Sequence, residues 1–205
     1  MNNLFNKYHK KYDAWYENNR FAYLSEVEAL KKVVPKKGKG LEVGVGTGRF
    51  ASLLGIKDGV DPSTQMIKIG KKRGLNARFG FGEKLPYANG SFDYAAIIIT
   101  ICFVKDPKLV ISEIRRVLKK EGRIIVGIVD KNSFLGRYYK SKKSVFYKNA
   151  RFFSAAEIIK LLKKAGFKKF ITYQTLSMLP QDIKLIEKPK KGFGRYGFVA
   201  IAGKK

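Results

Sequence analysis

The sequence predicts an α/β protein with a mostly parallel sheet of seven strands, helices on both faces and an antiparallel last strand. Short apolar segments alternate with segments of helical periodicity along most of the 205 residues, as in a parallel sheet with crossover helices. Residues 94–99 are apolar throughout, which is typical of a strand buried on both faces. The last two strands are separated by a Gly- and Lys-rich loop over 190–194 and not by a helix, so we expect them to be antiparallel.

The first helix is expected over residues 20–34, where Pro35 ends a pattern of apolar side chains at three- and four-residue steps. Its apolar stripe consists of Phe21, Leu24, Val27, Leu30 and Val34. Four further helices are expected over 50–54, 63–72, 109–118 and 153–164.

Capping residues support two of these helices. Ser63 or Thr64 is suited to cap the helix over 63–72. Ser154 and Glu157 form a capping-box sequence at the start of the last helix, and Gly166 is placed to end it as the C′ residue.

The seven strands are expected over 40–44, 57–60, 76–79, 94–99, 122–129, 167–176 and 198–202. One domain over residues 1–205 is expected, because this length suits a single core and no internal repeat is visible. Within it we expect an N-terminal helical cap over 1–34, a ligand-binding core over 38–129, an insertion over 130–153 and the C-terminal part of the sheet over 154–205.

The composition is strongly basic, with 43 Lys and Arg against 16 Asp and Glu and a formal net charge of +27. Such a surface attracts polyanions such as nucleic acid. The basic residues are scattered as pairs and form no tail, so a Lys-rich surface without a nucleic-acid partner is the simpler interpretation. The apolar segments are too short to span a bilayer and the N-terminus has no stretch of signal-peptide type, so we expect no membrane insertion and a cytoplasmic location.

Residues 42–48, Glu-Val-Gly-Val-Gly-Thr-Gly, form a Gly-rich turn after the first expected strand. Glycines at 44, 46 and 48 allow a tight turn and a close approach of ligand to backbone. Arg49 stands where a dinucleotide-binding turn has glycine or alanine, which argues against a pyrophosphate on the following helix. No Gly-Lys-Ser/Thr sequence follows, so the turn is not a phosphate-binding loop of the Walker A type.

This turn resembles the first motif of the class I S-adenosylmethionine (SAM)-dependent methyltransferases, and further segments stand in that family's order. Asp61 ends the second expected strand, as the family's acidic residue does, and residues 80–86, Gly-Phe-Gly-Glu-Lys-Leu-Pro, are similar to the family's segment beside the adenine. The other similar segments are Asn-Gly-Ser-Phe-Asp over 89–93, Leu-Lys-Lys-Glu-Gly-Arg over 118–123 and Tyr-Asp-Ala-Trp-Tyr over 12–16. The resemblance covers residues 8–170 and is closest to the small-molecule methyltransferases that include the ubiquinone-biosynthesis enzymes.

The resemblance implies a Rossmann-like fold with SAM as the cofactor. The cofactor site that it implies consists of Glu42, Gly44, Gly46, Gly48, Asp61, Pro62, Phe81, Gly82, Glu83 and Thr100. Asp61 would accept hydrogen bonds from the ribose hydroxyls. Phe81 stands where relatives have an aspartate that bonds the adenine amino group, so Phe81 either packs on the adenine or points into the core. The backbone amides of Gly82 and Glu83 would then recognise the adenine.

No catalytic residue is indicated. The histidine that many relatives carry near residues 102–103 is missing, and the single histidine, His9, lies near the N-terminus. Cys102 is the only cysteine and lacks the Pro-Cys context of cytosine-C5 methyltransferases, and no metal-ligand cluster is visible. Methyl transfer from a sulfonium needs mainly an aligned nucleophile and the exclusion of water.

The segment 131–152 is aromatic and basic, and it follows the fifth expected strand. Ligands of open α/β sheets bind beyond the carboxyl ends of the strands, so we expect this segment to face the methyl group, with residues 12–16 closing from the other side as a mobile lid. The expected substrate residues are Tyr12, Trp15, Tyr16, Tyr138, Tyr139 and Tyr147. The alternative is that these aromatics form the core of a connection.

Three functions remain open at this point. Methyl transfer to a small-molecule acceptor is favoured by the resemblance, and methyl transfer to RNA or another polyanion by the charge of +27. A non-catalytic SAM-binding module is suggested by Phe81 and by the missing histidine. No motif specifies the acceptor atom or the oligomeric state.

Overall fold

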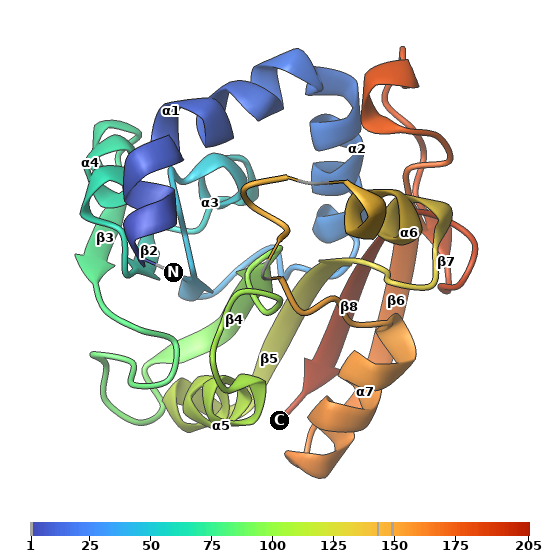
Figure 1. The fold of residues 1–205 in the computed structure, drawn as a ribbon. Helices are drawn as coiled ribbons and strands as arrows, with labels where there is room; N and C mark the ends of the chain where they lie inside the picture. Colours follow the sequence, from blue (N-terminus) through green and yellow to red (C-terminus); the bar gives the residue numbers. More distant parts are fainter. Residues whose placement is uncertain (1, 143, 149) are drawn as a thin grey trace.

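A computed structural model of the chain describes residues 2–142, 144–148 and 150–205, which form one eight-stranded sheet in the order β3-β2-β1-β4-β5-β8-β6-β7 (Figure 1). The strands are β1 (Gly40–Val43), β2 (Asp58–Asp61), β3 (Asn76–Phe79), β4 (Phe92–Ile98), β5 (Leu118–Val129), β6 (Lys168–Thr175), β7 (Lys190–Lys191) and β8 (Phe198–Lys204). Strands β3, β2, β1, β4 and β5 pair in parallel, and β8 is antiparallel to both β5 and β6. The expected mostly parallel sheet with an antiparallel last strand is therefore confirmed.

The sheet has one strand more than the seven expected. Strand β7 covers only two residues in the loop expected over 190–194, and it pairs with Tyr173 and Gln174 at the edge of the sheet. Two residues are too few to produce an alternating pattern in the sequence, so only the neighbouring strand reveals this pairing.

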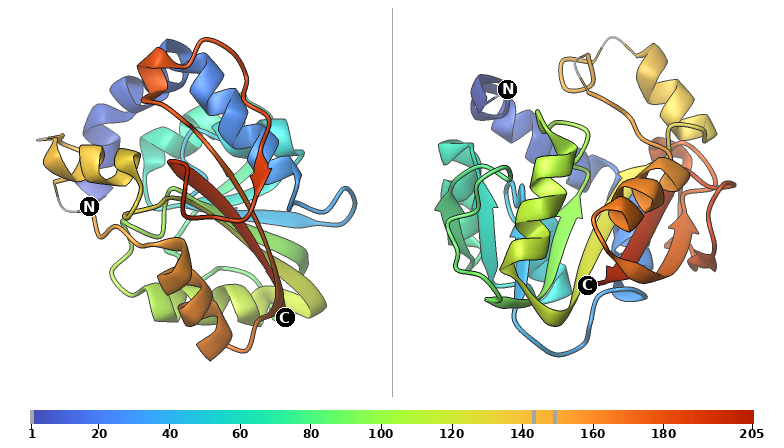
Figure 2. Two further views of the ribbon diagram at one scale, coloured as in Figure 1. Left: turned by 90° about the vertical axis from the view of Figure 1, so that its right-hand side faces the viewer. Right: turned by 90° about the horizontal axis from the view of Figure 1, so that it is seen from below.

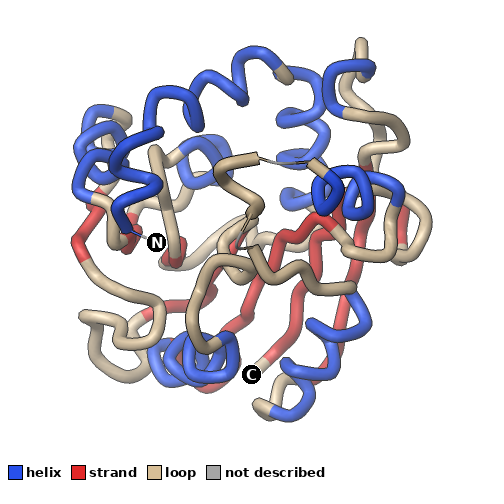
Figure 3. Tube along the Cα trace, viewed as in Figure 1, coloured by secondary structure: helices blue, strands red, loops and turns tan. Residues whose placement is uncertain are grey.

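The helices cover both faces of the sheet (Figures 2 and 3). They are α1 (Asn2–Asn18), α2 (Arg20–Lys31), α3 (Arg49–Leu54), α4 (Thr64–Lys72), α5 (Pro107–Val117), α6 (Phe134–Ser141) and α7 (Ala155–Lys164), with a 3₁₀ turn η1 (Pro180–Asp182). Helices α2, α3 and α4 pack into one hydrophobic core and α5 and α7 into the other. This arrangement leaves the carboxyl ends of the parallel strands exposed at one edge, where ligands of open α/β sheets bind.

The expected helix caps are present. The Ser63 hydroxyl accepts a hydrogen bond from the Met66 amide at the start of α4. Ser154 and Glu157 form the expected capping box of α7, and Gly166 follows that helix with a φ of +85°. These local signals therefore set the starts of α4 and α7 and the end of α7.

Helix α2 buries Val27 and Leu30 of the expected apolar stripe, but its buried face is wider than the stripe and leaves out Phe21. Phe21, assigned to the apolar stripe, is 42% exposed, whereas the polar residues Ser25 and Glu26 are buried. Helix α2 packs on β6 and β8 of the sheet. In the structure α2 also contacts α1 and η1, and these contacts enclose polar positions beside the stripe.

Two segments far apart in sequence lie near the carboxyl ends of the strands. Helix α1 crosses this region from α4 to α2, and α6 follows the carboxyl end of β5 (Figure 1). The helices of the region expected as an N-terminal cap are α1 and α2, and α6 lies in the region expected as an insertion. Both regions are thus placed to cover a ligand at this edge.

Candidate active site

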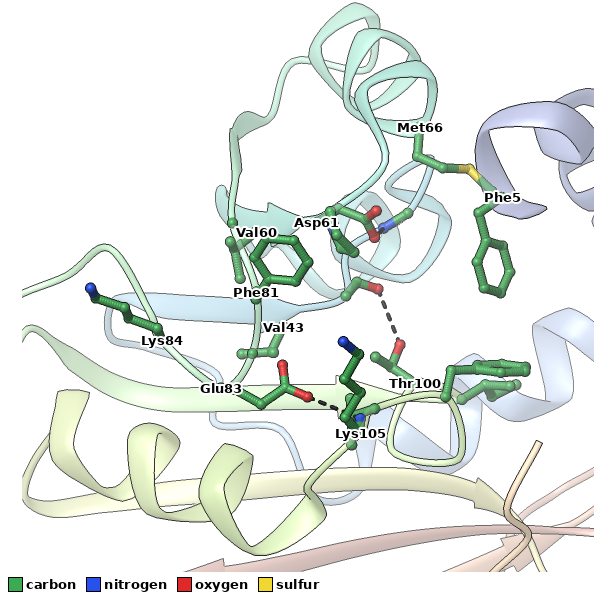
Figure 4. Close-up of a pocket in the computed structure, with 18 of the residues that line it drawn as sticks. Phe5, Val43, Val60, Asp61, Met66, Phe81, Glu83, Lys84, Thr100 and Lys105 are labelled. Atoms are coloured by element: carbon green, nitrogen blue, oxygen red, sulfur yellow. Dashed lines mark hydrogen bonds between the residues drawn. The ribbon is translucent and has the colours of Figure 1, made fainter. Parts of the chain in front are cut away.

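A cavity of about 690 Å³ lies at the carboxyl ends of β1, β2 and β4 (Figure 4). Its wall is formed by the ends of these strands, the start of α4, the turn after β3, the loop after β4 and two residues of α1. The lining residues are Phe5, Tyr12, Val43, Gly44, Gly46, Val60, Asp61, Pro62, Met66, Gly80, Phe81, Gly82, Glu83, Lys84, Ile99, Thr100, Phe103, Val104 and Lys105. Its volume is within the range of small-molecule sites, about 300–1,000 Å³.

The Gly-rich turn brings the backbone to the edge of this cavity. Gly44 has a φ of +73°, and a Cβ there would lie 2.2 Å from Cγ2 of Thr100, whose hydroxyl donates to the Gly44 carbonyl oxygen over 3.2 Å. Gly46 has a φ of +53°, and its Cβ would meet only Tyr12, at 3.8 Å. Gly44 therefore makes room for the strand-end packing, whereas Gly46 leaves space for a ligand.

Asp61 presents its carboxyl group to the cavity from the end of β2. One oxygen accepts from the Gly46 amide over 2.9 Å, and the other accepts from the Ser63 amide over 2.8 Å. Burial raises the pKa of Asp61 to about 6, against the effect of these two hydrogen bonds. A carboxyl group held in this way keeps further lone pairs for hydroxyl donors.

The segment after β3 forms the opposite part of the wall. The ring of Phe81 lies beside Asp61 in the cavity, 44% exposed and edge-to-face with Phe79, so it does not point into the core (Figure 4). The Glu83 carboxylate accepts from the Lys105 amide over 3.0 Å and thereby joins this segment to the loop after β4. An apolar ring and two connected loops make this part suited to a flat, mostly apolar group.

Two residues of the expected cofactor site do not line the cavity. Glu42 is 2% exposed, and one of its carboxylate oxygens is buried without a hydrogen-bond partner among the described residues. Gly48 lies against Leu75, whose Cδ1 would be 2.3 Å from a Cβ at that position. Both residues lie beneath the Gly-rich turn, away from the cavity. The sequence motif alone does not distinguish them from Gly44 and Gly46, which line the cavity.

Helix α1 is fastened over the turn by Asp13. Its carboxylate accepts from the Thr47 hydroxyl over 2.6 Å, from Arg49 over 2.6 and 2.9 Å, and from Arg73 over 2.8 and 3.1 Å. Burial alone would raise the pKa of Asp13, but these donors outweigh it and hold the pKa well below its usual range. The Asn6 side chain adds a second attachment, because its oxygen accepts from the Ser63 hydroxyl over 2.7 Å.

A second cavity of about 330 Å³ adjoins the first, and Phe5, Tyr12, Ile99 and Phe103 line both. All six residues expected to contact the substrate lie on its wall, namely Tyr12, Trp15, Tyr16, Tyr138, Tyr139 and Tyr147. They come from α1, from α6 and from the loop that follows α6. The structure thus brings together two aromatic groups that are more than a hundred residues apart in the sequence.

Buried tyrosine hydroxyls of this cavity, those of Tyr16 and Tyr147, are held in their neutral form. Tyr12 and Tyr16 share a hydrogen bond of 2.7 Å between their hydroxyl oxygens. Burial raises the pKa of Tyr16 and of Tyr147 well above the usual value. These side chains therefore act as neutral hydrogen-bonding groups and apolar surfaces and not as anions.

Several residues of the two cavities have no recognisable signal in the sequence. Phe5, Phe103 and Phe146 resemble ordinary core aromatics, and Glu26 falls within a helical pattern. Ile99 lines both cavities and has a φ of +48°, which is strained for a β-branched residue. A glycine there would have signalled a special backbone conformation, but an isoleucine does not.

The two other potentially reactive side chains, His9 and Cys102, do not line either cavity. His9 does not line either cavity, and its Nδ1 is 2.7 Å from the Asn6 carbonyl oxygen. Burial raises the pKa of the Cys102 thiol to about 12, which keeps it protonated. Among residues 2–142, 144–148 and 150–205, no three His, Cys, Asp or Glu side chains are grouped to hold a metal ion, and no helix is long and apolar enough to span a membrane.

Comparison with known proteins agrees with this arrangement. The family described as "Methyltransferase domain" matches residues 41–126. A crystal structure from Thermotoga maritima, named as a SAM-dependent methyltransferase and "possible histamine N-methyltransferase", is 50% identical, with a TM-score of 0.97 and 100% of both chains covered. The chain belongs to the SAM-dependent methyltransferases. Its fold is the Rossmann-like fold of class I, and its cofactor is SAM.

Two further relatives differ in how much they share with this methyltransferase. An uncharacterized protein of Methanocaldococcus jannaschii is 47% identical over 99% of both chains. A demethylmenaquinone methyltransferase of Thermotoga maritima is 34% identical, but the match covers 49% of this chain and 46% of that protein. The similarity to the demethylmenaquinone methyltransferase therefore covers about half of the chain, whereas the Methanocaldococcus jannaschii protein matches along the whole chain.

The residues present in the larger cavity fit SAM. The Cβ position of Gly46 is open toward the cavity, the Asp61 carboxyl is available to hydroxyl donors, and the Phe81 ring offers an apolar surface. Gly46 thus fits the amino-acid part of SAM, which must approach the backbone. The Asp61 carboxyl fits the ribose diol, and the Phe81 ring fits the adenine.

Proposed function

We propose that this methyltransferase transfers the methyl group of SAM to a small-molecule acceptor bound in the second, aromatic cavity. The observation that carries this proposal is the shared wall of the two cavities, formed by Phe5, Tyr12, Ile99 and Phe103. A cofactor in the larger cavity and an acceptor in the smaller one would meet at these residues. The volume of about 330 Å³ suits a small molecule and not a polymer.

In this proposal the residues of the larger cavity contact different parts of SAM. Gly46 lets the amino-acid part of SAM approach the backbone, Gly44 makes room for Thr100 beside it, and Asp61 accepts hydrogen bonds from the ribose hydroxyls. The remaining residues of the predicted site, Pro62, Phe81, Gly82, Glu83 and Thr100, enclose the adenosine, with Glu42 and Gly48 supporting the turn. SAM supplies a methyl group already activated on a sulfonium.

The protein's own contribution is alignment and the exclusion of water. The tyrosines of α1 and of the segment 130–153 close over the acceptor and hold it against the methyl group. Their faces also stabilise a sulfonium or another cation through cation–π attraction. In this proposal both segments are the lid of a single methyltransferase domain.

The relatives support a small-molecule acceptor. The Thermotoga maritima structure at 50% identity is named for histamine, and the partial relative is named for demethylmenaquinone. Both names refer to small molecules, although the acceptors differ in size and polarity.

Replacement of the cavity tyrosines tests this proposal. With tritium-labelled SAM and metabolite pools as acceptors, Tyr138→Ala, Tyr139→Ala and Tyr147→Ala are each expected to lower methyl transfer. SAM affinity, measured by calorimetry, should change by less than about tenfold, because these residues do not line the larger cavity. Tyr196→Ala is the matched control, since Tyr196 lies outside both cavities. Normal transfer by all three cavity variants, or no labelled product from any small-molecule pool, would contradict the proposal.

A polyanionic acceptor is the second candidate, favoured by the net charge of +27. The same labelling experiment includes RNA as a separate acceptor. A labelled RNA product at physiological salt, with no small-molecule product, would favour this candidate over the first.

A further inference from the structure

A buried carboxyl group without a partner lies on the wall of the aromatic cavity. Glu26, in α2, is 1% exposed and lines this cavity together with the tyrosines of α1 and α6. Its Oε2 atom is fully buried and has no hydrogen-bond partner among the described residues. Buried polar groups in folded proteins are nearly always hydrogen-bonded, so this oxygen requires an explanation.

Two neighbouring hydroxyl groups, those of Ser25 and Tyr16, form hydrogen bonds with other partners. The Ser25 hydroxyl donates to the Phe21 carbonyl oxygen over 2.7 Å and accepts from the Glu187 amide over 2.9 Å. Tyr16 shares its hydroxyl hydrogen bond with Tyr12. Burial without a donor raises the pKa of Glu26 well above its usual value. Burying a carboxyl in this way costs stability unless a ligand provides the missing donor.

We propose that Glu26 binds the protonated amino group of the acceptor and makes the aromatic cavity selective for small amines. This inference rests on the proposed function, because it takes the aromatic cavity to be the acceptor site. An ammonium group supplies the missing hydrogen-bond donor, and its positive charge favours the ionised form of the Glu26 carboxyl, which releases its proton to solvent when the amine binds. Glu26 is thus a specificity-determining residue that fixes one end of the acceptor.

The rest of the cavity agrees with a cationic guest. Trp15 and the tyrosines around Glu26 present aromatic faces, which attract an ammonium group. Lys11 and Lys142 also line the cavity, but both are exposed, and the Lys142 ammonium lies over the Tyr138 ring, 4.6 Å from its centroid. The positive charges are therefore at the rim and the carboxyl group is inside. An anionic acceptor would form no ion pair with the Glu26 carboxyl, whereas a cationic acceptor would.

Binding of matched probes tests the inference without requiring turnover. The full-length protein, saturated with S-adenosylhomocysteine, is titrated by calorimetry with 2-phenylethylamine, 2-phenylethanol and phenylacetate. We expect the wild type to bind the amine at least about tenfold more tightly than the alcohol, as a charge-assisted hydrogen bond implies. Glu26→Gln should remove this preference while S-adenosylhomocysteine affinity stays unchanged.

The matched control is Glu28→Gln, which removes the same charge from the same helix. Glu28 is exposed and paired with Lys31, so this variant should keep the preference for the amine. If Glu26→Gln proves unstable, Glu26→Leu replaces it, because an apolar side chain avoids the cost of a buried carboxyl.

The outcomes separate this inference from the proposed function. Equal binding of amine and alcohol by the wild type, a preference retained in Glu26→Gln, tighter binding of phenylacetate, or no binding of any probe overturns the role of Glu26. Methyl transfer to a non-amine small molecule in the tritium screen would leave the proposed function standing and would also overturn amine selectivity. The proposed function itself fails if that screen gives no small-molecule product or if all three tyrosine variants transfer the methyl group normally.

Discussion

At the scale of single residues, Asp61 is the group whose charge responds to pH near neutrality. Its two oxygens are held by the amides of Gly46 and Ser63, and burial raises its pKa to about 6. The ribose hydroxyls of SAM would donate to the ionised form. Ligand binding therefore favours ionisation, and protons compete with SAM for this carboxyl group.

We expect the affinity for SAM to fall as the pH drops through about 6. Above the pKa of the free protein Asp61 is ionised and the affinity is constant. One pH unit below it, most molecules must first lose a proton, so the affinity should be about tenfold lower. Calorimetry across this pH range measures the effect.

Asp61→Asn provides the comparison. This variant should bind SAM more weakly by about 1.5–3 kcal/mol at high pH and should show no pH dependence of this kind, because it has no titrating group. The same loss of affinity is expected for Asp61→Ala with the fold intact. A flat profile in the wild type would mean that Asp61 does not contact the ribose.

Asp61 and Glu26 show what sequence can reveal about single residues. Asp61 follows a short strand that comes after a Gly-rich turn, so its place in the chain predicts its place at the edge of the sheet. Glu26 stands within a helical pattern, where a charged residue is usually solvated. Its burial depends on α1 and η1 covering α2, and no local pattern specifies that packing.

At the scale of elements, the attachment of α1 decides whether the two cavities have a complete wall. Phe5 and Tyr12 line both cavities from this helix. Asp13 holds the helix through Arg49 and Arg73, with its side chain 19% exposed. Arg49, whose position argues against a dinucleotide-binding turn, thus helps to hold α1 in place by pairing with Asp13.

We expect Asp13→Asn to loosen α1. The neutral side chain keeps its size but loses the charge that joins two guanidinium groups. The free energy of unfolding should fall by about 1.5–3 kcal/mol, the usual contribution of hydrogen bonds to charged groups. SAM affinity should also decrease, since α1 completes the wall of its cavity. Chemical denaturation, limited proteolysis of the N-terminal segment and calorimetry measure these effects.

Glu17→Gln is the control for Asp13→Asn. Glu17 also pairs with Arg49, but its side chain is 64% exposed, and exposed ion pairs contribute about 0–1 kcal/mol. Equal stability of the two variants would show that Asp13 is not the anchor of α1.

The core elements were predictable because each has a local signal. Strand β4 and residues 124–129 of β5 are mostly apolar, β1 leads into the Gly-rich turn, and α4 and α7 begin at recognisable caps. Helix α6 and strand β7 lack such signals. Helix α6 has eight residues with a glycine inside, and β7 has two residues, so their formation depends on the neighbours that they pack against.

At the scale of the whole molecule, the candidate active site is assembled from segments that lie far apart in the sequence. The aromatic cavity takes residues from α1, α2, the loop after β4, α6 and the η1 turn. The sequence identified the tyrosines because their segments were expected at the carboxyl edge of the sheet. Which face of each segment turns inward is a result of tertiary packing, and for this reason Phe5, Phe146 and Glu26 were not foreseen.

The net charge of +27 raises the question of whether polyanions bind at the active site or only to the surface. We expect RNA to bind at low salt and to dissociate steeply as salt rises, because each phosphate contact lowers the logarithm of the binding constant by about 0.7 per tenfold increase in salt. Methyl transfer to a small molecule should change little over the same range, since the acceptor cavity is enclosed by aromatic residues. Fluorescence anisotropy with a labelled single-stranded RNA, measured beside the tritium transfer assay, tests both statements. If RNA binding persists at physiological salt and competes with the small-molecule acceptor, polyanions bind at the active site and not only to the surface.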